Sequence, residues 1–193
     1  MKDAIKYIGG KFLEMGQKQF DFMVEEGLKP EHTLIDIACG AGRGGIKFIP
    51  YLDKGNYYGI EQHLWLIDAG NKIIGYEILE EKRPRIYCHK NFDFSFVDIK
   101  ADYALAKSLF THLTKPKIKE CLNNLKSVLK QDGKFYASIF IGDSKNNLKE
   151  DNDNKKFQYS IKEIEELAEG WEVKNLGNRR CLRQNMLMFT LKQ

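Results

Sequence analysis

Strand-like runs alternate with helical segments from about residue 33 onward, and this alternation constrains the fold more than any other feature. Short apolar runs typical of buried strands occur at 33–38, 57–61, 85–89, 102–106 and 134–140. Parallel strands that are joined by helices need right-handed crossovers and a cover on both faces of their sheet. The pattern therefore predicts an α/β fold with a doubly wound, mainly parallel sheet.

The helical segments are recognised by apolar spacing and by signals at their ends. Helices are predicted over 11–26, 42–49, 63–80 and 114–129, and after residue 160. Pro50 is expected to end or kink the second of them. Thr114 stands at an N-cap position before Pro116, and Ser160 with Glu163 has the pattern of a capping box.

The two ends of the chain and one polar stretch complete this organisation. Residues 1–30 are predicted to form an N-terminal helical segment, and Asp132-Gly133 is predicted to turn into the strand at 134–140. The polar stretch 141–157 is predicted to be a mobile loop, which either covers a bound substrate as a lid or is a disordered loop in solvent. The last two strands, at 171–176 and 185–191, are expected to pair as an antiparallel hairpin.

Composition excludes several classes of protein. A chain of 193 residues, 42% hydrophobic and 30% charged, is predicted to be a single globular domain over residues 1–193. No apolar run approaches the roughly 18 residues of a membrane span, and the first residues lack a signal peptide, so a cytoplasmic protein without membrane partners is predicted. The cysteines and histidines lack metal-site spacing, which predicts metal independence. A net charge of +4, spread along the chain, argues against a nucleic-acid partner.

A glycine-rich turn follows the first strand and opens a helix. Gly40 and Gly42 remove the side chains that would keep backbone N–H groups from a ligand, and a helix N-terminus favours a negative group. Glu61 ends the second strand, 21 residues after Gly40, where an acid hydrogen-bonds ribose hydroxyls in nucleotide-binding sheets. Together these residues predict a ligand that contains adenosine.

The same glycines leave an alternative open. Gly40-x-Gly42-x-x-Gly45 matches the dinucleotide fingerprint, which would make the protein an NAD-binding oxidoreductase. Asp36 argues against this alternative, because a carboxylate in the strand before the turn would repel a pyrophosphate. A helix before the first strand, and a C-terminal hairpin that leaves no second domain for a hydride acceptor, argue the same way.

With these residues the chain resembles the class I S-adenosylmethionine-dependent methyltransferases. The family motif of three apolar residues, an acid and alternate glycines is matched over 33–42, with Asp36 as the acid and Ala38 in place of the first glycine. The resemblance runs from the helix before the first strand to the final hairpin. It implies a Rossmann-like seven-stranded sheet with a reversed last strand, S-adenosyl-L-methionine as the cofactor and S-adenosyl-L-homocysteine as its product.

The resemblance also implies which residues hold the cofactor. Gly40 and Gly42 would let the backbone approach its methionine part, and Asp36 would orient this turn or bind the ammonium group. Glu61 would bind both ribose hydroxyls. Ala38 departs from the family glycine, and because alanine is the smallest substitute we expect a slightly displaced turn rather than a lost site.

Further cofactor contacts are implied at four positions. Asp93 is the candidate acceptor for the adenine amino group and Phe94 for a main-chain contact, although an aspartate here can also cap a turn. The carbonyl of Ala106, like that of Ala38, is expected near the cofactor's ammonium group. Arg43 would meet the cofactor carboxylate or an anionic acceptor, unless it is a solvated side chain at a helix start.

The segment 106–113 follows the fourth strand and resembles the S-x-F-T-H-L segment of small bacterial methyltransferases, which are often associated with natural-product or surface-glycan modification. His112 is the candidate catalytic base and a substrate contact, because imidazole titrates near neutral pH; packing in the core is its alternative role. Ser108 and Tyr159 are candidate substrate contacts, with a turn hydroxyl and a core aromatic as their alternatives.

These features predict a methyltransferase that acts on a small-molecule or glycan-precursor acceptor, at a hydroxyl group. The motifs of enzymes that methylate exocyclic base nitrogens or carbon 5 of pyrimidines do not occur, which disfavours base methylation. Two other functions stay open: a methyltransferase-like binding subunit without catalytic activity, because of Ala38, and methylation of RNA or protein, because of the small basic excess. The sequence leaves the identity of the acceptor and the oligomeric state open.

Overall fold

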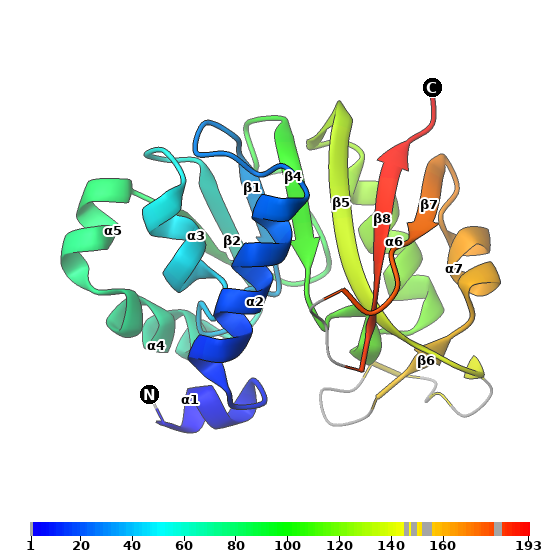
Figure 1. Cartoon of the computed structure of the whole chain (residues 1–193), viewed down its shortest axis with the longest axis horizontal. Coiled ribbons are helices and arrows are strands. Elements are labelled where there is room, and N and C mark those ends of the chain that lie inside the picture. Colours follow the sequence, from blue (N-terminus) through cyan, green and yellow to red (C-terminus); the bar gives the residue numbers. More distant parts are fainter. Residues whose placement is uncertain (1, 145–146, 148–149, 152–155, 180–182) are drawn as a thin grey trace. The chain divides into compact units, whose positions relative to one another are not determined.

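The computed structural model describes residues 2–144, 147, 150–151, 156–179 and 183–193 (Figure 1). Its contacts divide the chain into two compact units, Met1–Lys90 and Asn91–Gln193. Each unit has its own strands and helices. The single-domain organisation over the whole chain therefore stays a prediction.

Parallel strands form the sheet of the first unit. β1 (Leu34–Ile37) pairs with β2 (Tyr57–Glu61), and β2 pairs with β3 (Arg85–Cys88), all in parallel. Every side chain of β1 and β2 is buried, as the continuous apolar runs predict for a parallel sheet. The helices of this unit are α1 (Lys2–Tyr7), α2 (Phe12–Glu25), α3 (Gly45–Tyr51), α4 (Leu64–Ile74) and α5 (Tyr76–Lys82).

The prediction of one long helix over 63–80 is wrong, because two helices occupy this segment. α4 ends at Ile74, and Gly75 has φ 92° and ψ 146°, a conformation that glycine adopts without a Cβ penalty. The N–H of Gly75 still donates to the Asn71 carbonyl at 3.0 Å before α5 begins. Apolar spacing continues through the break, so periodicity alone did not reveal it. Pro50 does not end α3 either, since the helix includes it and continues to Tyr51.

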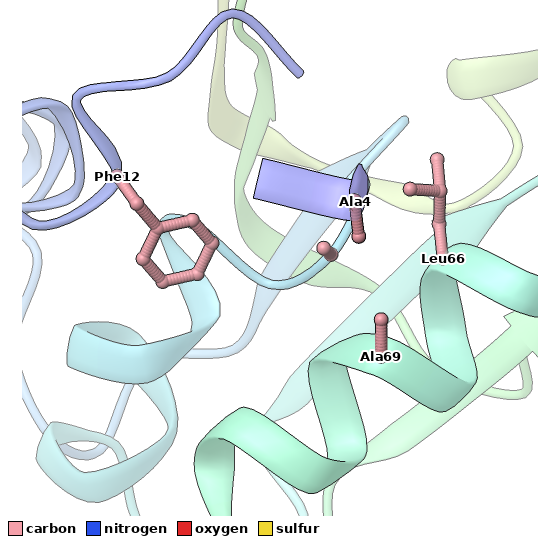
Figure 2. Close-up of a cluster of buried hydrophobic side chains, with 5 residues drawn as sticks. Ala4, Phe12, Leu66 and Ala69 are labelled. Atoms are coloured by element: carbon pink, nitrogen blue, oxygen red, sulfur yellow. The ribbon is translucent and has the colours of Figure 1, made fainter. Parts of the chain in front are cut away.

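The short N-terminal helix α1 is held by apolar packing within the first unit. Ala4 and Phe12 form a buried cluster with Ala41, Leu66 and Ala69. Figure 2 shows Ala4 facing Leu66 and Ala69 of α4. The start of the chain is thus packed against the helix that follows β2.

The second unit contains the reversed strand and the hairpin that the sequence predicts. β4 (Ala101–Ala106) pairs in parallel with β5 (Leu129–Ile141), and β8 (Asn185–Leu191) lies antiparallel between β5 and β7 (Trp171–Asn175). The predicted hairpin is therefore confirmed. The other elements are η1 (Phe110–His112), α6 (Lys115–Leu125), α7 (Ile161–Leu167) and β6 (Gln158–Tyr159), a two-residue strand on β5 that the sequence did not predict.

Two boundaries in the second unit differ from the predicted ones, and the first is the end of α6, which lies at Leu125 rather than at residue 129. β5 already begins at Leu129, so Asp132 and Gly133 lie within the strand rather than in a turn before it. The pairing with β4 shifts register between Ala101 and Tyr103, which accommodates this irregular start. A polar, glycine-containing segment of this kind is typical of a turn in sequence, and here it lies between Leu129 and Lys134, the β5 residues that pair with Ala101 and Tyr103 of β4.

The predicted cap at Thr114 and the predicted loop over 141–157 have only partial counterparts. Thr114 stands at the N-cap of α6 but its side chain makes no capping bond, whereas its N–H donates to Asp151 Oδ1 at 2.6 Å.

Within the loop predicted over 141–157, the Asn147 side chain makes two hydrogen bonds with the backbone of Gln158. Residues 145–146, 148–149 and 152–155 lie outside the described residues, so the mobile lid stays a prediction.

The capping box at the start of α7 is confirmed, and it offers a test of the fold. Ser160 Oγ accepts from the N–H of Glu163 at 3.2 Å, and Glu163 Oε2 accepts from the N–H of Ser160 at 2.8 Å. We predict that Ser160→Ala lowers the free energy of unfolding by about 1 kcal/mol, because the N–H group of Glu163 in the first turn of the helix loses its acceptor. Urea denaturation measures this, with Ser95→Ala on an exposed turn as the control; equal loss in both variants would contradict the assignment.

Candidate functional site

The turn after β1 combines three residues in the left-handed conformation. Ala38, Gly40 and Gly42 have φ values of 58°, 59° and 72°. Glycine adopts such angles freely, whereas alanine does so at a cost of about 1 kcal/mol. Ala38 thus takes a conformation that glycine adopts at no cost, and the turn has left-handed angles at three alternate positions although alanine occupies the first of them.

Two glycines on neighbouring helices hold this turn from both sides. A Cβ on Gly16 of α2 would lie 2.2 Å from the carbonyl oxygen of Arg43, and a Cβ on Gly70 of α4 would lie 2.9 Å from the carbonyl carbon of Ala41. Only glycine permits backbone contacts this close. Neither glycine is among the site residues predicted from the sequence, although a glycine in the interior of a helix is an unfavourable choice that itself indicates a packing requirement.

Glu61 joins the end of β2 to the glycine turn. Its Oε2 accepts from the N–H of Gly40 at 3.0 Å and its Oε1 from the N–H of His63 at 2.9 Å. The side chain is 5% exposed, and burial raises the pKa of its carboxyl group. Because an ionised carboxylate offers about four acceptor positions, the carboxylate keeps acceptor capacity for ribose hydroxyls. The carboxylate is therefore fixed in place and fits this part of the implied cofactor.

Asp36 lies under the same turn, in β1. Its Oδ2 accepts from the Tyr57 hydroxyl at 2.8 Å, and the side chain is 4% exposed. Burial raises the pKa of Asp36 to about 7, against the lowering effect of the Tyr57 bond and of the Arg43 charge. Burial likewise lowers the pKa of Arg43, while the charge of Asp36 opposes this. Asp36 thus holds the Tyr57 hydroxyl in place next to the glycine turn. This position suits the predicted role of Asp36, which is to orient the turn.

The segment after α1 covers the glycine turn. A Cβ on Gly40 would lie 3.2 Å from Ile8 Cγ2, so Ile8 occupies the space above this glycine. Next to it, the ring of Tyr7 makes edge contacts with Trp65 and His63, with centroids 5.2 and 6.0 Å apart. The turn and the start of α4 therefore share one apolar cover.

The residues predicted to bind adenine belong to the second unit. Asp93 Oδ1 accepts from the N–H of Ser95 at 2.9 Å, which is the geometry of an aspartate that caps a turn. Phe94 is buried, with 2% of its surface exposed. Ala106 is the buried last residue of β4. Contacts of these three residues with the cofactor stay predictions.

The candidate acceptor residues differ in their surroundings. His112 ends η1 in a half-buried position, and Ser108 lies in a polar network with Lys107, Ser138 and Gln184. Tyr159 is 1% exposed and its hydroxyl donates to the Leu113 carbonyl at 2.5 Å. Burial also raises the pKa of Tyr159 to about 12. This geometry is that of the core aromatic, the alternative to a substrate contact, and we leave Tyr159 out of the proposed acceptor site.

The described ranges contain no candidate metal site and no helix that could cross a membrane. No group of three or more His, Cys, Asp or Glu side chains there could hold a metal ion. None of the helices described is both long and apolar enough to span a bilayer.

Comparison with known families decides what this arrangement is. A family described as a methyltransferase domain matches residues 35–135, a range that contains Asp36, the glycine turn, Glu61 and His112. The chain belongs to this family. The resemblance to S-adenosylmethionine-dependent methyltransferases and the cofactor of that family are thereby confirmed, and the dinucleotide alternative loses its support.

Solved methyltransferases share the fold. A glycopeptide N-methyltransferase, MtfA, in complex with S-adenosyl-L-homocysteine matches with a TM-score of 0.71 and 10% identity, over 92% of this chain and 90% of that chain. An S-adenosylmethionine-dependent methyltransferase from Clostridium acetobutylicum matches with a TM-score of 0.70 and 11% identity, over 99% and 96% of the two chains. The predicted Rossmann-like α/β class is therefore confirmed.

A further solved structure and one curated relative complete the comparison. Magnesium protoporphyrin IX methyltransferase from Synechocystis, with bound S-adenosylmethionine, matches with a TM-score of 0.65 and 14% identity, over 92% of this chain and 80% of that one. An uncharacterised protein of Methanocaldococcus jannaschii is 28% identical over 163 residues, which cover 75% of this chain. The match spans only 42% of that relative's length.

The buried carboxyl of Asp36 predicts how stability depends on pH. Since its pKa is about 7 in the folded protein and 3.8 in an unperturbed chain, the folded state binds more protons between these values. Stability should therefore fall as pH rises from about 4 to about 7, by up to roughly 1.4 kcal/mol for each pH unit, and level off above. Asp36→Asn keeps an acceptor for Tyr57 but cannot ionise, so it should flatten this slope.

Chemical denaturation at several pH values between about 5 and about 8 measures the effect. Asp68→Asn, at an exposed position of α4, is the matched control. An unchanged slope in Asp36→Asn would show that Asp36 is not the group that titrates.

Proposed function

We propose that this chain transfers the methyl group of S-adenosylmethionine to a hydroxyl of a small-molecule or glycan-precursor acceptor. The observation that carries the cofactor half is the Glu61 carboxylate, fixed by two backbone N–H groups beside the glycine turn with acceptor positions to spare. When bound, S-adenosylmethionine supplies a methyl group on a sulfonium, which is open to in-line displacement. The family match supports the reaction class, and the acceptor is our inference from the segment after β4.

The residues of the first unit bind and orient the cofactor in this proposal. Glu61 accepts hydrogen bonds from the ribose hydroxyls, and Gly40 and Gly42 allow the methionine part to approach the backbone. Asp36 and Tyr57 support the turn from below. The rate of an in-line displacement depends mainly on how well the acceptor and the methyl group are aligned. Fixing the cofactor in this way therefore supplies much of the acceleration.

The residues after β4 hold the acceptor in this proposal. His112 takes the proton of the acceptor hydroxyl at an imidazole nitrogen, because a hydroxyl must lose its proton as the new bond to carbon forms. Ser108 contacts the acceptor, and its position is fixed by the hydrogen bond from its N–H to Ser138 Oγ at 2.7 Å.

Calorimetric titration with S-adenosylhomocysteine tests the cofactor half. We predict binding to the wild-type protein and a loss of affinity of about 10- to 150-fold in Glu61→Gln, because a charged acceptor of hydrogen bonds is replaced by a neutral amide. Glu77→Gln, on the exposed face of α5, removes the same charge and should bind as the wild type does. NAD should not bind; binding of NAD in place of S-adenosylhomocysteine would contradict the proposal.

Turnover tests the acceptor half. We predict that the protein converts S-adenosylmethionine to S-adenosylhomocysteine in the presence of hydroxylated sugar acceptors, and that His112→Gln lowers kcat by about 10²- to 10⁴-fold at neutral pH. The variant should still bind S-adenosylhomocysteine as the wild type does. Cofactor binding without turnover on any acceptor would favour the catalytically inactive binding subunit.

A further inference from the structure

Four polar side chains form a hydrogen-bonded network at the carboxyl end of β4. Lys107 and Ser108 follow β4 directly, Ser138 lies in β5, and Gln184 directly precedes β8. The carboxyl ends of parallel strands are the edge at which open α/β sheets bind their ligands. The network therefore lies where a ligand is expected.

Strand pairing, rather than closeness in sequence, builds this network. Ser138 pairs with Met186 of β8, two residues after Gln184. It also follows Ala137, the β5 partner of Ala106 at the end of β4. Three chain segments are thus brought to one point by the register of the sheet.

Three donors converge on one oxygen, Gln184 Oε1. Lys107 Nζ lies 2.5 Å from it, Ser138 Oγ 2.8 Å and Ser108 Oγ 3.0 Å. An amide oxygen has two lone pairs, so three donors are more than it can satisfy well. A carboxylate or phosphate group offers more acceptor positions and a negative charge, which strengthens each of these bonds. The donor set fits an anionic oxygen better than the amide oxygen that now occupies it.

We call the three donor residues, Lys107, Ser108 and Ser138, the oxygen cradle. The two serines are held in place by further hydrogen bonds. Ser138 is completely buried, and its Oγ also accepts from the N–H of Ser108. Ser108 has φ 63°, a costly conformation for a residue other than glycine, and Thr111 Oγ1 donates to its carbonyl at 2.7 Å. Backbone strain that the surroundings hold in place is typical of binding sites.

We propose that the oxygen cradle binds an anionic oxygen of the methyl acceptor, a carboxylate or phosphate, which displaces the side-chain oxygen of Gln184. This assignment rests on the proposed function, since it takes the ligand at this edge to be the acceptor. Lys107 then makes an ion pair with the acceptor, and Ser108 and Ser138 donate to the same group. The acceptor is accordingly an acidic molecule, and neutral analogues bind more weakly.

Titration with small anions tests the oxygen cradle without knowledge of the acceptor. Acetate and inorganic phosphate are titrated into the protein saturated with S-adenosylhomocysteine, with acetamide as the neutral match of acetate. Gln184→Ala removes the resident oxygen and should bind acetate or phosphate about tenfold more tightly than the wild type. Gln184→Glu brings its own carboxylate and should bind neither. Whichever anion binds more tightly identifies the acidic group of the acceptor as carboxylate or phosphate.

Removing the cation completes the test. Adding Lys107→Met to Gln184→Ala should weaken anion binding by about tenfold or more, whereas adding Lys119→Met, on an exposed face of α6, should leave it unchanged. Unchanged affinity for S-adenosylhomocysteine in all variants shows that they are folded. Equal anion affinity in the Lys107 and Lys119 variants, or equal binding of acetamide and acetate, would overturn the proposal.

Two further results separate this proposal from the proposed function. Competition between acetate and S-adenosylhomocysteine for one site would overturn the acceptor assignment and give the oxygen cradle to the cofactor's own carboxylate. Failure of S-adenosylhomocysteine to bind the wild-type protein would overturn the proposed function. The acetate titration of the unliganded protein would then still decide whether the oxygen cradle binds anions.

Discussion

The hydrogen bond from the N–H of Gly40 to the Glu61 carboxylate connects the two parts of the chain on which a cofactor site depends. It ties the turn after β1 to the end of β2, and it does so with an acceptor that keeps positions free for a ligand. The pairing of β1 with β2 brings the two residues together, and Gly16 and Gly70 let α2 and α4 approach the turn closely enough to fix it. Sheet, turn and helices thus share one constraint.

This arrangement buries acids at a cost to stability. Desolvation raises the pKa of both Asp36 and Glu61, which means that the folded state disfavours their ionised forms. Tyr57 and backbone N–H groups offset part of this cost. Such burial has little value for folding alone, and it is typical of sites that bind polar ligands. The oxygen cradle of the second unit likewise combines features that cost stability, a buried Ser138 and a strained Ser108, at a place suited to binding a polar ligand.

The strands, the hairpin and the position of the glycine turn before a helix could be predicted from the sequence, because these depend on local patterns. Buried parallel strands are continuous apolar runs, and the glycine turn with Glu61 has a fixed spacing. Gly75 breaks a helix without interrupting its apolar periodicity, so its effect depends on a backbone angle that the pattern does not record. Ser138 and Gln184 stand 46 residues apart, and only the pairing of β5 with β8 makes them neighbours. Contacts of this kind need the register of the sheet, which the sequence alone does not provide.

The most direct test of the account is a crystal structure of the protein with S-adenosylhomocysteine bound. The account predicts that both ribose hydroxyls lie about 2.5–3.0 Å from the Glu61 carboxylate, and that the N–H of Gly40 still donates to Oε2. The methionine part would then lie against the backbone of the glycine turn. A ribose bound away from Glu61, with the carboxylate bonded only to the backbone, would contradict the central role given to this residue.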